Sequence, residues 1–303
     1  MKESFKGERI LFLSPAFFGY ENLILDKLRE MGAYVELIIL HPGENLHSQI
    51  KSKLHSGIFN CLFVIKGEYL SREDLENIQN SKCDRKILYL YDSIKRYPIT
   101  TEYFPYFNKI YTFEKEDAEK YGLDFRPLFY SNTYVGLDKT DLQYDIASIS
   151  SFYFERFEIF KKLRIEYPKL KLKLKLYSSV RDIIKNRWKY VIQNPNLFLY
   201  KKLSQSDVAM LLASSNCILD IQNNKQNGLT IRTIETLALQ RKLITTNKTV
   251  AKYDFYNPKN ILIINDNKNL SSISSFINIP YEPVDSSIIY KYSLSSFLFE
   301  IFE

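Results

Sequence analysis

The segment 220–247 (DIQNNKQNGLTIRTIETLALQRKLITTN) holds the residues whose types and spacing best suit chemistry. An apolar run leads into a polar loop and then a helical pattern, which places the loop beyond a strand's carboxyl end, where parallel sheets bind ligands. Gly228 permits close approach of a backbone or a positive φ. The N–H groups of Leu229, Thr230 and Ile231 should lack partners at the helix start, and with the helix dipole they form an anion site suited to a diphosphate.

Two charged residues follow in the same helix. Arg232 lies in the first turn and can add charge-assisted hydrogen bonds to a phosphate. Glu235, one turn further, is placed to accept two ribose hydroxyls. The alternative is a capped helix with a surface Arg232–Glu235 ion pair, which contributes roughly a few tenths of a kcal/mol. A cation at the positive end of a helix is unfavourable unless an anion binds there, and this favours the anion site.

Two other loops follow apolar runs. The loop 14–19 (SPAFFG) has one glycine, Gly19, and no G-x-G-x-x-G, which argues against a dinucleotide dehydrogenase. One interpretation is that Gly19 lets an acceptor substrate approach a cleft. The alternative is that packing of the aromatic side chains orders this loop and that it has no ligand. In the second loop Asp92, beside Ser93, is a candidate general base or acceptor ligand. The alternative for Asp92 is a turn or helix cap.

Several kinds of site lack support. The cysteines Cys61, Cys83 and Cys217 have no zinc-ligand spacing, and their odd number argues against a disulfide framework. All three histidines lie within residues 41–55, where nothing completes a metal site, and we expect a solvated helix and loop there. G-x-S-x-G is absent, so a serine nucleophile is not indicated.

The formal net charge of +7 is carried largely by lysines among aromatic residues. Such a surface attracts nucleic acid or an anionic membrane face. No nucleic-acid-binding motif is present, so the charge favours an anionic substrate or membrane proximity, and an ordinary solvated lysine-rich surface explains it equally well. The aromatic-rich C-terminus adds to the membrane hypothesis. No apolar run reaches the roughly 18–20 residues of a membrane span.

Strand and helix patterns alternate along the chain, which predicts an α/β fold with parallel sheets. In the first half strands are expected at 9–14, 34–40, 61–65, 87–91 and 109–112, and helices at 20–31, 71–79 and 114–121. In the second half strands are expected at 144–149, 170–176, 197–199, 217–221, 243–246 and 261–264. Helices are expected at about 153–166, at 204–213 and at 286–302, and a further helix after the strand 217–221 ends at 240. The polar stretch 131–143 between the halves is the expected domain boundary.

These residues resemble a known family. The segment NGLTIRTIETLALQRKLITTN is similar to the donor-binding stretch of GT-B-fold glycosyltransferases, in which a glutamate opens an E-A-L-A helix and a K-x-(I/V)-T-T-N strand follows. The chain further resembles bacterial capsular or lipopolysaccharide glycosyltransferases related to the spore protein CgeB. The stretches that carry this resemblance are 17–38, 88–98 (LYLYDSIKRYP), 107–130 and 220–247.

The resemblance implies two Rossmann-like domains facing a cleft. They are an acceptor domain (1–138) and a nucleotide-sugar domain (139–283), and a C-terminal helix (284–303) returns to the first domain. It implies transfer of a sugar from a UDP- or GDP-linked donor to a cell-envelope glycan or lipid-linked acceptor. Many retaining GT-B enzymes carry two glutamates eight positions apart, whereas the first position here is Asn227. Nucleotide binding is therefore better supported than any sugar contact.

The resemblance and the loops together give the predicted residues. Donor contacts are expected from Asn227, Gly228, Leu229, Thr230, Arg232 and Glu235, acceptor contacts from Gly19, Tyr20 and Ser93, and catalysis from Asp92. No metal, other cofactor or nucleic acid is expected. The protein is expected in the cytoplasm, and the membrane hypothesis would place it peripherally at the inner face of the cell membrane. The alternatives are a nucleotide-sugar 2-epimerase, which the scarcity of histidine in the second half argues against, and a non-catalytic glycan-binding or scaffold protein.

Overall fold

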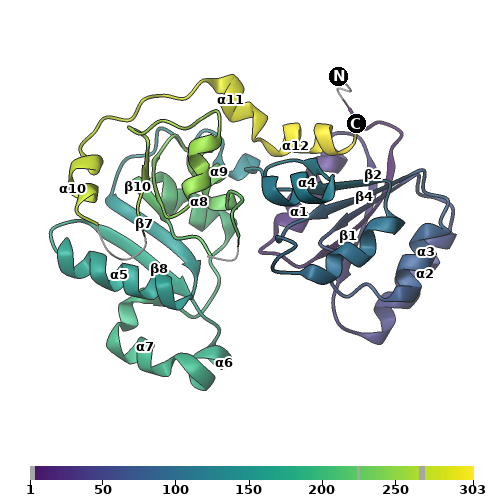
Figure 1. Cartoon of the computed structure of the whole chain (residues 1–303), viewed down its shortest axis with the longest axis horizontal. Helices are drawn as coiled ribbons and strands as arrows, with labels where there is room; N and C mark the ends of the chain where they lie inside the picture. The colour runs from purple at the N-terminus through teal and green to yellow at the C-terminus, as the bar shows by residue number, and fades with distance from the viewer. Residues whose placement is uncertain (1–3, 224–225, 266–269) are drawn as a thin grey trace. The chain divides into compact units, whose positions relative to one another are not determined.

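The computed structural model describes residues 4–223, 226–265 and 270–303. Contacts divide the chain into two compact units, each built around its own parallel sheet (Figure 1). Unit 1 comprises Met1–Phe129, Asn224–Leu229 and Lys291–Glu303, and unit 2 comprises Tyr130–Asn223 and Thr230–Tyr290. The predicted α/β class with two Rossmann-like units is confirmed.

Unit 1 contains six parallel strands in the order β2-β1-β3-β4-β5-β6. They are β1 (Arg9–Pro15), β2 (Tyr34–Leu40), β3 (Cys61–Ile65), β4 (Arg85–Leu90), β5 (Lys109–Thr112) and β6 (Asp124–Phe125). The order reverses between β1 and β3, as in flavodoxin-like sheets. Strands β1 and β3 are buried almost throughout, which explains their near-continuous apolar sequence.

The helices of unit 1 are α1 (Tyr20–Glu30), α2 (Glu44–His55), α3 (Arg72–Gln79), α4 (Lys115–Tyr121), α12 (Leu294–Ile301) and the 3-10 helix η1 (Pro98–Tyr106). Helix α3 begins at Ser71, whose hydroxyl accepts from the N–H of Asp74 while the Asp74 carboxylate accepts from the N–H of Ser71. This is a capping box, which the spacing of Ser71 and Asp74 favours. Helix α4 ends at Gly122 with φ 66°, a conformation that glycine adopts without strain.

The C-terminal helix α12 packs within unit 1, as predicted. Leu294, Phe297, Leu298 and Ile301 of this helix are buried, and Phe299 is half-buried. The Tyr111 hydroxyl donates to the backbone oxygen of Glu300 at 2.9 Å. Because this aromatic segment forms core, our inference that the C-terminus contacts a membrane is wrong for these side chains.

Unit 2 also contains six parallel strands, in the order β12-β11-β10-β7-β8-β9. They are β7 (Tyr144–Ser151), β8 (Leu172–Tyr177), β9 (Phe198–Leu199), β10 (Ser215–Asp220), β11 (Lys242–Thr245) and β12 (Ile261–Ile263). The first and fourth strands of the unit are neighbours, which is the Rossmann order and puts the switch point between β7 and β10.

The helices of unit 2 are α5 (Phe154–Glu166), α6 (Val180–Asp182), α7 (Trp188–Gln193), α8 (Gln205–Ala213), α9 (Ile231–Ala238), α10 (Ser272–Ile277) and α11 (Ser286–Lys291). A π-helical turn, η3 (Ile183–Arg187), joins α6 to α7. Short 3-10 helices are η2 (Asn132–Tyr134), η4 (Pro195–Leu197) and η5 (Lys248–Lys252). Helix α8 is capped by Ser204, which accepts from the N–H of Asp207 as the spacing predicts.

The sequence patterns missed or misjudged several elements. The 180–193 helical run, α10 and η1 were not expected from the sequence. The helix expected over 286–302 is two helices, since Ser293 caps α12 by accepting from the N–H of Ser296 at 3.1 Å. None of the helices in the described part of the chain is both long and apolar enough to span a bilayer.

Candidate functional site

The carboxyl ends of β7 and β10 flank the switch point of unit 2, where open parallel sheets bind ligands. Helix α9 begins here at Thr230, whose side chain accepts from the N–H of Thr233. The Thr230 and Thr233 hydroxyls both donate to the Asp220 carboxylate at the end of β10. Asp220 therefore fixes the start of α9 against the strand that precedes it.

The N–H groups that were predicted to bind an anion lie just before α9 and at its start, because the helix begins at Ile231 and Thr230 is its N-cap. Among the described residues, no hydrogen-bond partner is recorded for the N–H of Leu229, Thr230 or Ile231. These groups and the helix dipole place partial positive charge at the switch point. Of the predicted donor segment, residues 224–225 lie outside the described residues.

Arg232 and Glu235 form the ion pair of our alternative interpretation, at 2.7 Å, but the pair is not on the surface. The Glu235 side chain is fully buried and that of Arg232 is 17% exposed. Tyr134, also buried, lies against both side chains, and its pKa is raised chiefly by burial and then by the Glu235 charge. The Glu235 carboxylate is thus shielded from solvent in this structure.

A second arginine, Arg156 in α5, lies at the same edge and was missed by the sequence analysis. Its guanidinium donates to the backbone oxygens of Ile221 at 2.8 Å and Ser151 at 3.0 Å, and lies 4.8 Å from the Tyr153 ring centre. Burial lowers the pKa of Arg156; the Asp220 charge opposes this, and the Arg232 charge adds to it. The sequence signal was its position two residues into the helix after β7.

Two guanidinium groups and two carboxylates, those of Asp220 and Glu235, lie at the switch point, and the two guanidinium groups differ in their hydrogen-bond partners. Arg156 makes no salt bridge to any carboxylate that the structure describes, and its partners are neutral carbonyls. Arg232 also approaches the end of β7, donating to the Ile149 oxygen at 3.4 Å. Two guanidinium groups near free helix N–H groups suit a ligand with two linked anionic groups.

The segment between β10 and α9 belongs in part to unit 1. There the Glu114 carboxylate accepts from the N–H of Asn227 at 2.9 Å and of Gly228 at 2.6 Å. A Cβ on Gly228 would lie 2.6 Å from the Phe113 ring and 2.7 Å from its backbone oxygen. Gly228 thus permits the close approach that we predicted, but to Phe113 rather than to a ligand. Burial raises the pKa of Glu114 to about 7.

Asp92, the predicted catalytic residue, follows β4 and is held by several donors. Its carboxylate accepts from Lys66 at 2.9 Å, Arg96 at 2.8 Å and the Gln226 amide at 2.9 Å. Lys66 also pairs with Glu68 at 3.1 Å. The carboxylate is the centre of a charge network at the carboxyl edge of sheet 1.

The predicted acceptor residues surround the switch point of unit 1. Gly19 starts α1 with φ 85°, and Phe18 before it has φ 54° and is 47% exposed. Tyr20 is buried, with its ring edge-on to Phe129. Ser93 is buried, and its backbone oxygen accepts from the N–H groups of two residues in the next turn. Of these residues, Gly19 is the one whose loop is open to solvent.

Lys66 and Tyr69, on the loop after β3, also adopt left-handed backbone conformations, with φ 67° and 72°. Non-glycine residues in this region cost roughly 1–3 kcal/mol each and cluster at functional sites. With Phe18 they mark both loops that flank the β1–β3 switch point. This conformational signal cannot be read from residue types.

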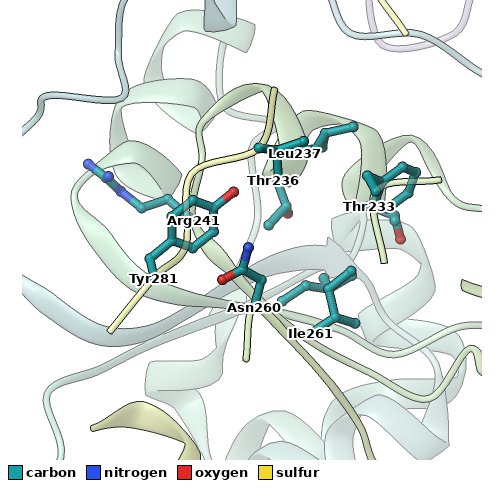
Figure 2. Close-up of a pocket in the computed structure, with 10 residues that line it drawn as sticks. Thr233, Thr236, Leu237, Arg241, Asn260, Ile261 and Tyr281 are labelled. Carbon is teal, nitrogen blue, oxygen red and sulfur yellow. The ribbon is translucent and has the colours of Figure 1, made fainter. Parts of the chain in front are cut away.

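A small cavity lies at the far end of α9 in unit 2 (Figure 2). Thr236, Asn260 and Tyr281 line it, and its volume of about 20 Å³ has room for a single water molecule. The Arg241 guanidinium beside the cavity donates hydrogen bonds to the backbone oxygens of Ala213, Asp138 and Thr140. The cavity is too small for a nucleotide, and its polar groups stabilise the fold.

The histidines have local partners in unit 1. His47 Nδ1 lies 2.6 Å from the Asp74 carboxylate, and His55 Nδ1 lies 2.8 Å from the Lys51 oxygen. Over the described residues, no three histidine, cysteine or acidic side chains gather as metal ligands.

The fold can now be compared with known proteins. A scan against protein-family models finds no match, and a search of curated proteins finds no relative. Solved structures do match along nearly the whole chain. One is AviGT4, a glycosyltransferase involved in avilamycin A biosynthesis, with TM-score 0.65, 9% identity, and coverage of 97% of this chain and 95% of that one. The chain has the two-domain GT-B fold.

Two further GT-B structures refine the comparison. Anabaena HepE (Alr3699) in complex with UDP-glucose is similar with TM-score 0.65 and 10% identity, covering 97% of this chain and 98% of that one. The UDP-GlcNAc 2-epimerase of Methanocaldococcus jannaschii is similar with TM-score 0.50 and 10% identity, covering 91% and 95%. At these identities the likeness establishes the fold, and the chemistry depends on the site.

Proposed function

We propose that this protein is a glycosyltransferase that moves a sugar from a nucleotide-activated donor to an acceptor. The observation that carries the proposal is the pair Arg156 and Arg232 at the β7–β10 switch point, where Arg156 has neutral carbonyl partners. A nucleoside diphosphate supplies the two linked anions that this site lacks.

The same charges would assist the chemistry. When the bond between the sugar and the diphosphate breaks, negative charge grows on the leaving phosphate oxygen. Fixed guanidinium groups and helix N–H groups stabilise that charge more than they stabilise the intact donor, which lowers the barrier. We propose that Arg156, Arg232 and the first N–H groups of α9 do this without a resident metal ion or other cofactor.

Glu235 remains our proposed contact for the donor ribose. Its carboxylate is paired with Arg232 and buried, so ribose binding requires a shift of the Arg232 side chain. An approaching diphosphate would provide a competing partner for Arg232. Donor binding and exposure of Glu235 would then be coupled in one step.

For the acceptor, we propose the carboxyl edge of sheet 1, with Gly19, Tyr20 and Ser93 near it and Asp92 as the base. Lys66 and Arg96 hold the Asp92 carboxylate in place. A base positioned in this way needs one oxygen released to reach an acceptor hydroxyl. The Gln226 amide and Arg96 both donate to Oδ1, so we propose that Oδ1 is released when both hydrogen bonds are lost.

The finer assignment rests on the resemblance of the four sequence stretches. We propose a cell-envelope glycan, of capsule or lipopolysaccharide type, or its lipid-linked precursor, as the acceptor. UDP- or GDP-linked sugars are the proposed donors, and HepE, which has the same fold, was solved with UDP-glucose. We place the protein in the cytoplasm at the inner face of the membrane.

Isothermal titration with UDP, GDP and CMP tests the donor site. We expect one nucleoside diphosphate to bind, and Glu235→Ala to bind it more weakly. Binding of none of the three, or equal binding by Glu235→Ala, would count against the proposal. Since 2-epimerases share this fold, NMR of donor incubated without acceptor separates the reactions: an epimer indicates the epimerase. Nucleotide binding without turnover on any acceptor indicates a scaffold.

A further inference from the structure

Helices α6 and α7 lie at one end of unit 2 (Figure 1). The helical run α6–η3–α7 carries a row of solvent-exposed apolar side chains. Val180, Ile184, Trp188 and Ile192 recur every four residues and are 56%, 71%, 58% and 71% exposed. Single exposed apolar residues are ordinary, but four in one row form a contiguous patch that calls for a partner.

The π-helical turn η3 keeps this row straight. In an α-helix, residues four apart drift around the axis, because a turn takes about 3.6 residues. The i→i+5 bonding of a π-helix widens the turn and reduces the rotation per residue. Since η3 spans Ile183–Arg187, it offsets the drift in the middle of the row.

A second row, of cations, runs beside the first. Arg181, Lys185 and Lys189 each follow one apolar residue of the row, and all three are exposed. For these three cations, no salt bridge to a carboxylate is recorded in the described part of the chain. After the short strand β9, which pairs with the end of β8, come the exposed Lys201 and Lys202.

The opposite face of the run is fixed to the unit. Tyr190 packs against Phe152 and Phe157, with ring centres 5.3 and 5.1 Å away. Arg187 donates to the Ser178 hydroxyl at 2.8 Å and lies over the Phe152 ring. The exposed rows therefore sit on a helix that is already ordered, so a partner need not provide the free energy of folding it.

We propose that the α6–η3–α7 surface docks on an anionic lipid bilayer. An exposed apolar row with tryptophan, flanked by lysine and arginine, matches a helix that lies in the membrane interface. The apolar side chains would enter the acyl boundary while the flanking cations meet the anionic head groups. A second copy of the chain fits less well, because a two-fold contact would bring the two cationic rows together.

The position of the α6–η3–α7 surface suggests why the protein would dock on a membrane, and this part of the inference rests on the proposed glycosyltransferase function. It follows the carboxyl end of β8, the strand next to β7, so it lies along the same sheet edge as the proposed donor site. A lipid-linked acceptor would thus be held near the site of transfer. Docking itself requires no nucleotide.

Trp188 is the only tryptophan in the chain, so its fluorescence reports on this surface directly. The full chain should be titrated with vesicles of phosphatidylcholine, with and without phosphatidylglycerol. We expect the emission to shift to the blue, and brominated acyl chains to quench it, only with phosphatidylglycerol present. Ile184→Ser should weaken vesicle partitioning about tenfold, since an apolar side chain is removed. Lys185→Gln should weaken it roughly fivefold.

Matched controls lie on α5 and just beyond it. Ile165 is 70% exposed but outside the row, and Lys169 is exposed too, so Ile165→Ser and Lys169→Gln should bind vesicles like the parent. Absence of a blue shift, equal losses in row and control variants, or a blue shift that grows with protein concentration without lipid would each overturn the proposal. Nucleotide titration without lipid is separate, so either proposal can fail alone.

Discussion

The two sheets are similar in size but differ at their carboxyl edges. In unit 1 the switch point lies between β1 and β3, and two cations near it, Lys66 and Arg96, both form salt bridges with the Asp92 carboxylate. In unit 2 it lies between β7 and β10, where Arg156 has carbonyl partners and Arg232 has a buried carboxylate. Two edges of the same architecture therefore suit different ligands.

This difference matters because the architecture alone does not select the ligand. An edge whose cations form salt bridges with a carboxylate suits a neutral, hydroxyl-bearing acceptor. An edge where one arginine donates to backbone carbonyls, beside helix N–H groups with no recorded partner among the described residues, suits an anion. The assignment of the donor to unit 2 and the acceptor to unit 1 depends on this contrast, and the following variants would sharpen or break it.

The largest expected effect is on stability in unit 2. Arg232→Met leaves the fully buried Glu235 carboxylate without its cation, which should lower the free energy of unfolding by about 4 kcal/mol. Arg96→Met should cost less than about 1 kcal/mol, because Arg96 is 37% exposed and Asp92 keeps Lys66. Urea unfolding measures both. Equal losses in the two variants would contradict the difference between the two sheet edges. The double variant Arg232→Met with Glu235→Gln removes both charges of the pair and should recover stability.

Gly228→Ala tests the packing of the loop before α9. The added Cβ would meet the Phe113 ring and backbone oxygen at 2.6 and 2.7 Å, so we expect a loss of about 3 kcal/mol from overpacking. Gly43→Ala is the matched control, because its nearest neighbour is the His41 side chain at 3.2 Å, on the surface. Thermal and urea unfolding that place both variants at the parent's stability would contradict this geometry.

Glu114 should make stability depend on pH. Burial raises the pKa of Glu114 to about 7. The two backbone N–H donors lower this pKa, and the charges of Asp117 and Glu116 raise it. Because the folded state holds this proton more tightly than the unfolded state, its contribution is greatest below pH 4.5 and is lost as the pH rises through about 7.

Glu114→Gln should therefore reduce the change in the free energy of unfolding between acid and neutral pH by on the order of 2 kcal/mol. Glu119→Gln changes an exposed residue of α4, the helix whose N-cap is Glu114, and should keep the parent's pH dependence. Urea midpoints measured across that pH range provide the comparison. A slope unchanged in Glu114→Gln would assign the proton to another group.

The smallest effect compares two helix caps. Thr230 caps α9 at the proposed donor site and Ser71 caps α3 in unit 1. Thr230→Ala and Ser71→Ala should each cost about 1 kcal/mol of stability. The account expects only Thr230→Ala to weaken nucleotide binding as well, measured by titration. If Ser71→Ala weakens binding to the same degree, the effect is general loss of fold.

Much of this fold could be predicted from the sequence. Strands β2, β3 and β5 lie where the apolar runs placed them, and the caps at Ser71 and Ser204 each have the aspartate three residues later that favours a helix start. Both signals are local, which is why they survive without a structure. The strand orders could not be predicted, because the same alternation is compatible with either switch point.

The site was predictable only in part. The segment that contains Arg232 and Glu235 was found because residue types and helix position are visible in sequence. Arg156 was missed, since only the adjacency of β7 and β10 brings it to that segment. The burial of the Arg232–Glu235 pair and the binding of Gly228 by Glu114 depend on tertiary packing, and no residue pattern signals them.

The most direct measurement is a calorimetric titration of the parent, Arg156→Met and Arg164→Met with the nucleoside diphosphate that binds best. Arg164 lies on the same helix as Arg156 but is exposed near its end. The account predicts that Arg156→Met weakens binding about thirtyfold, through loss of a charged hydrogen-bond donor, and that Arg164→Met leaves it unchanged. Equal affinity in all three proteins would contradict a donor site at the β7–β10 edge.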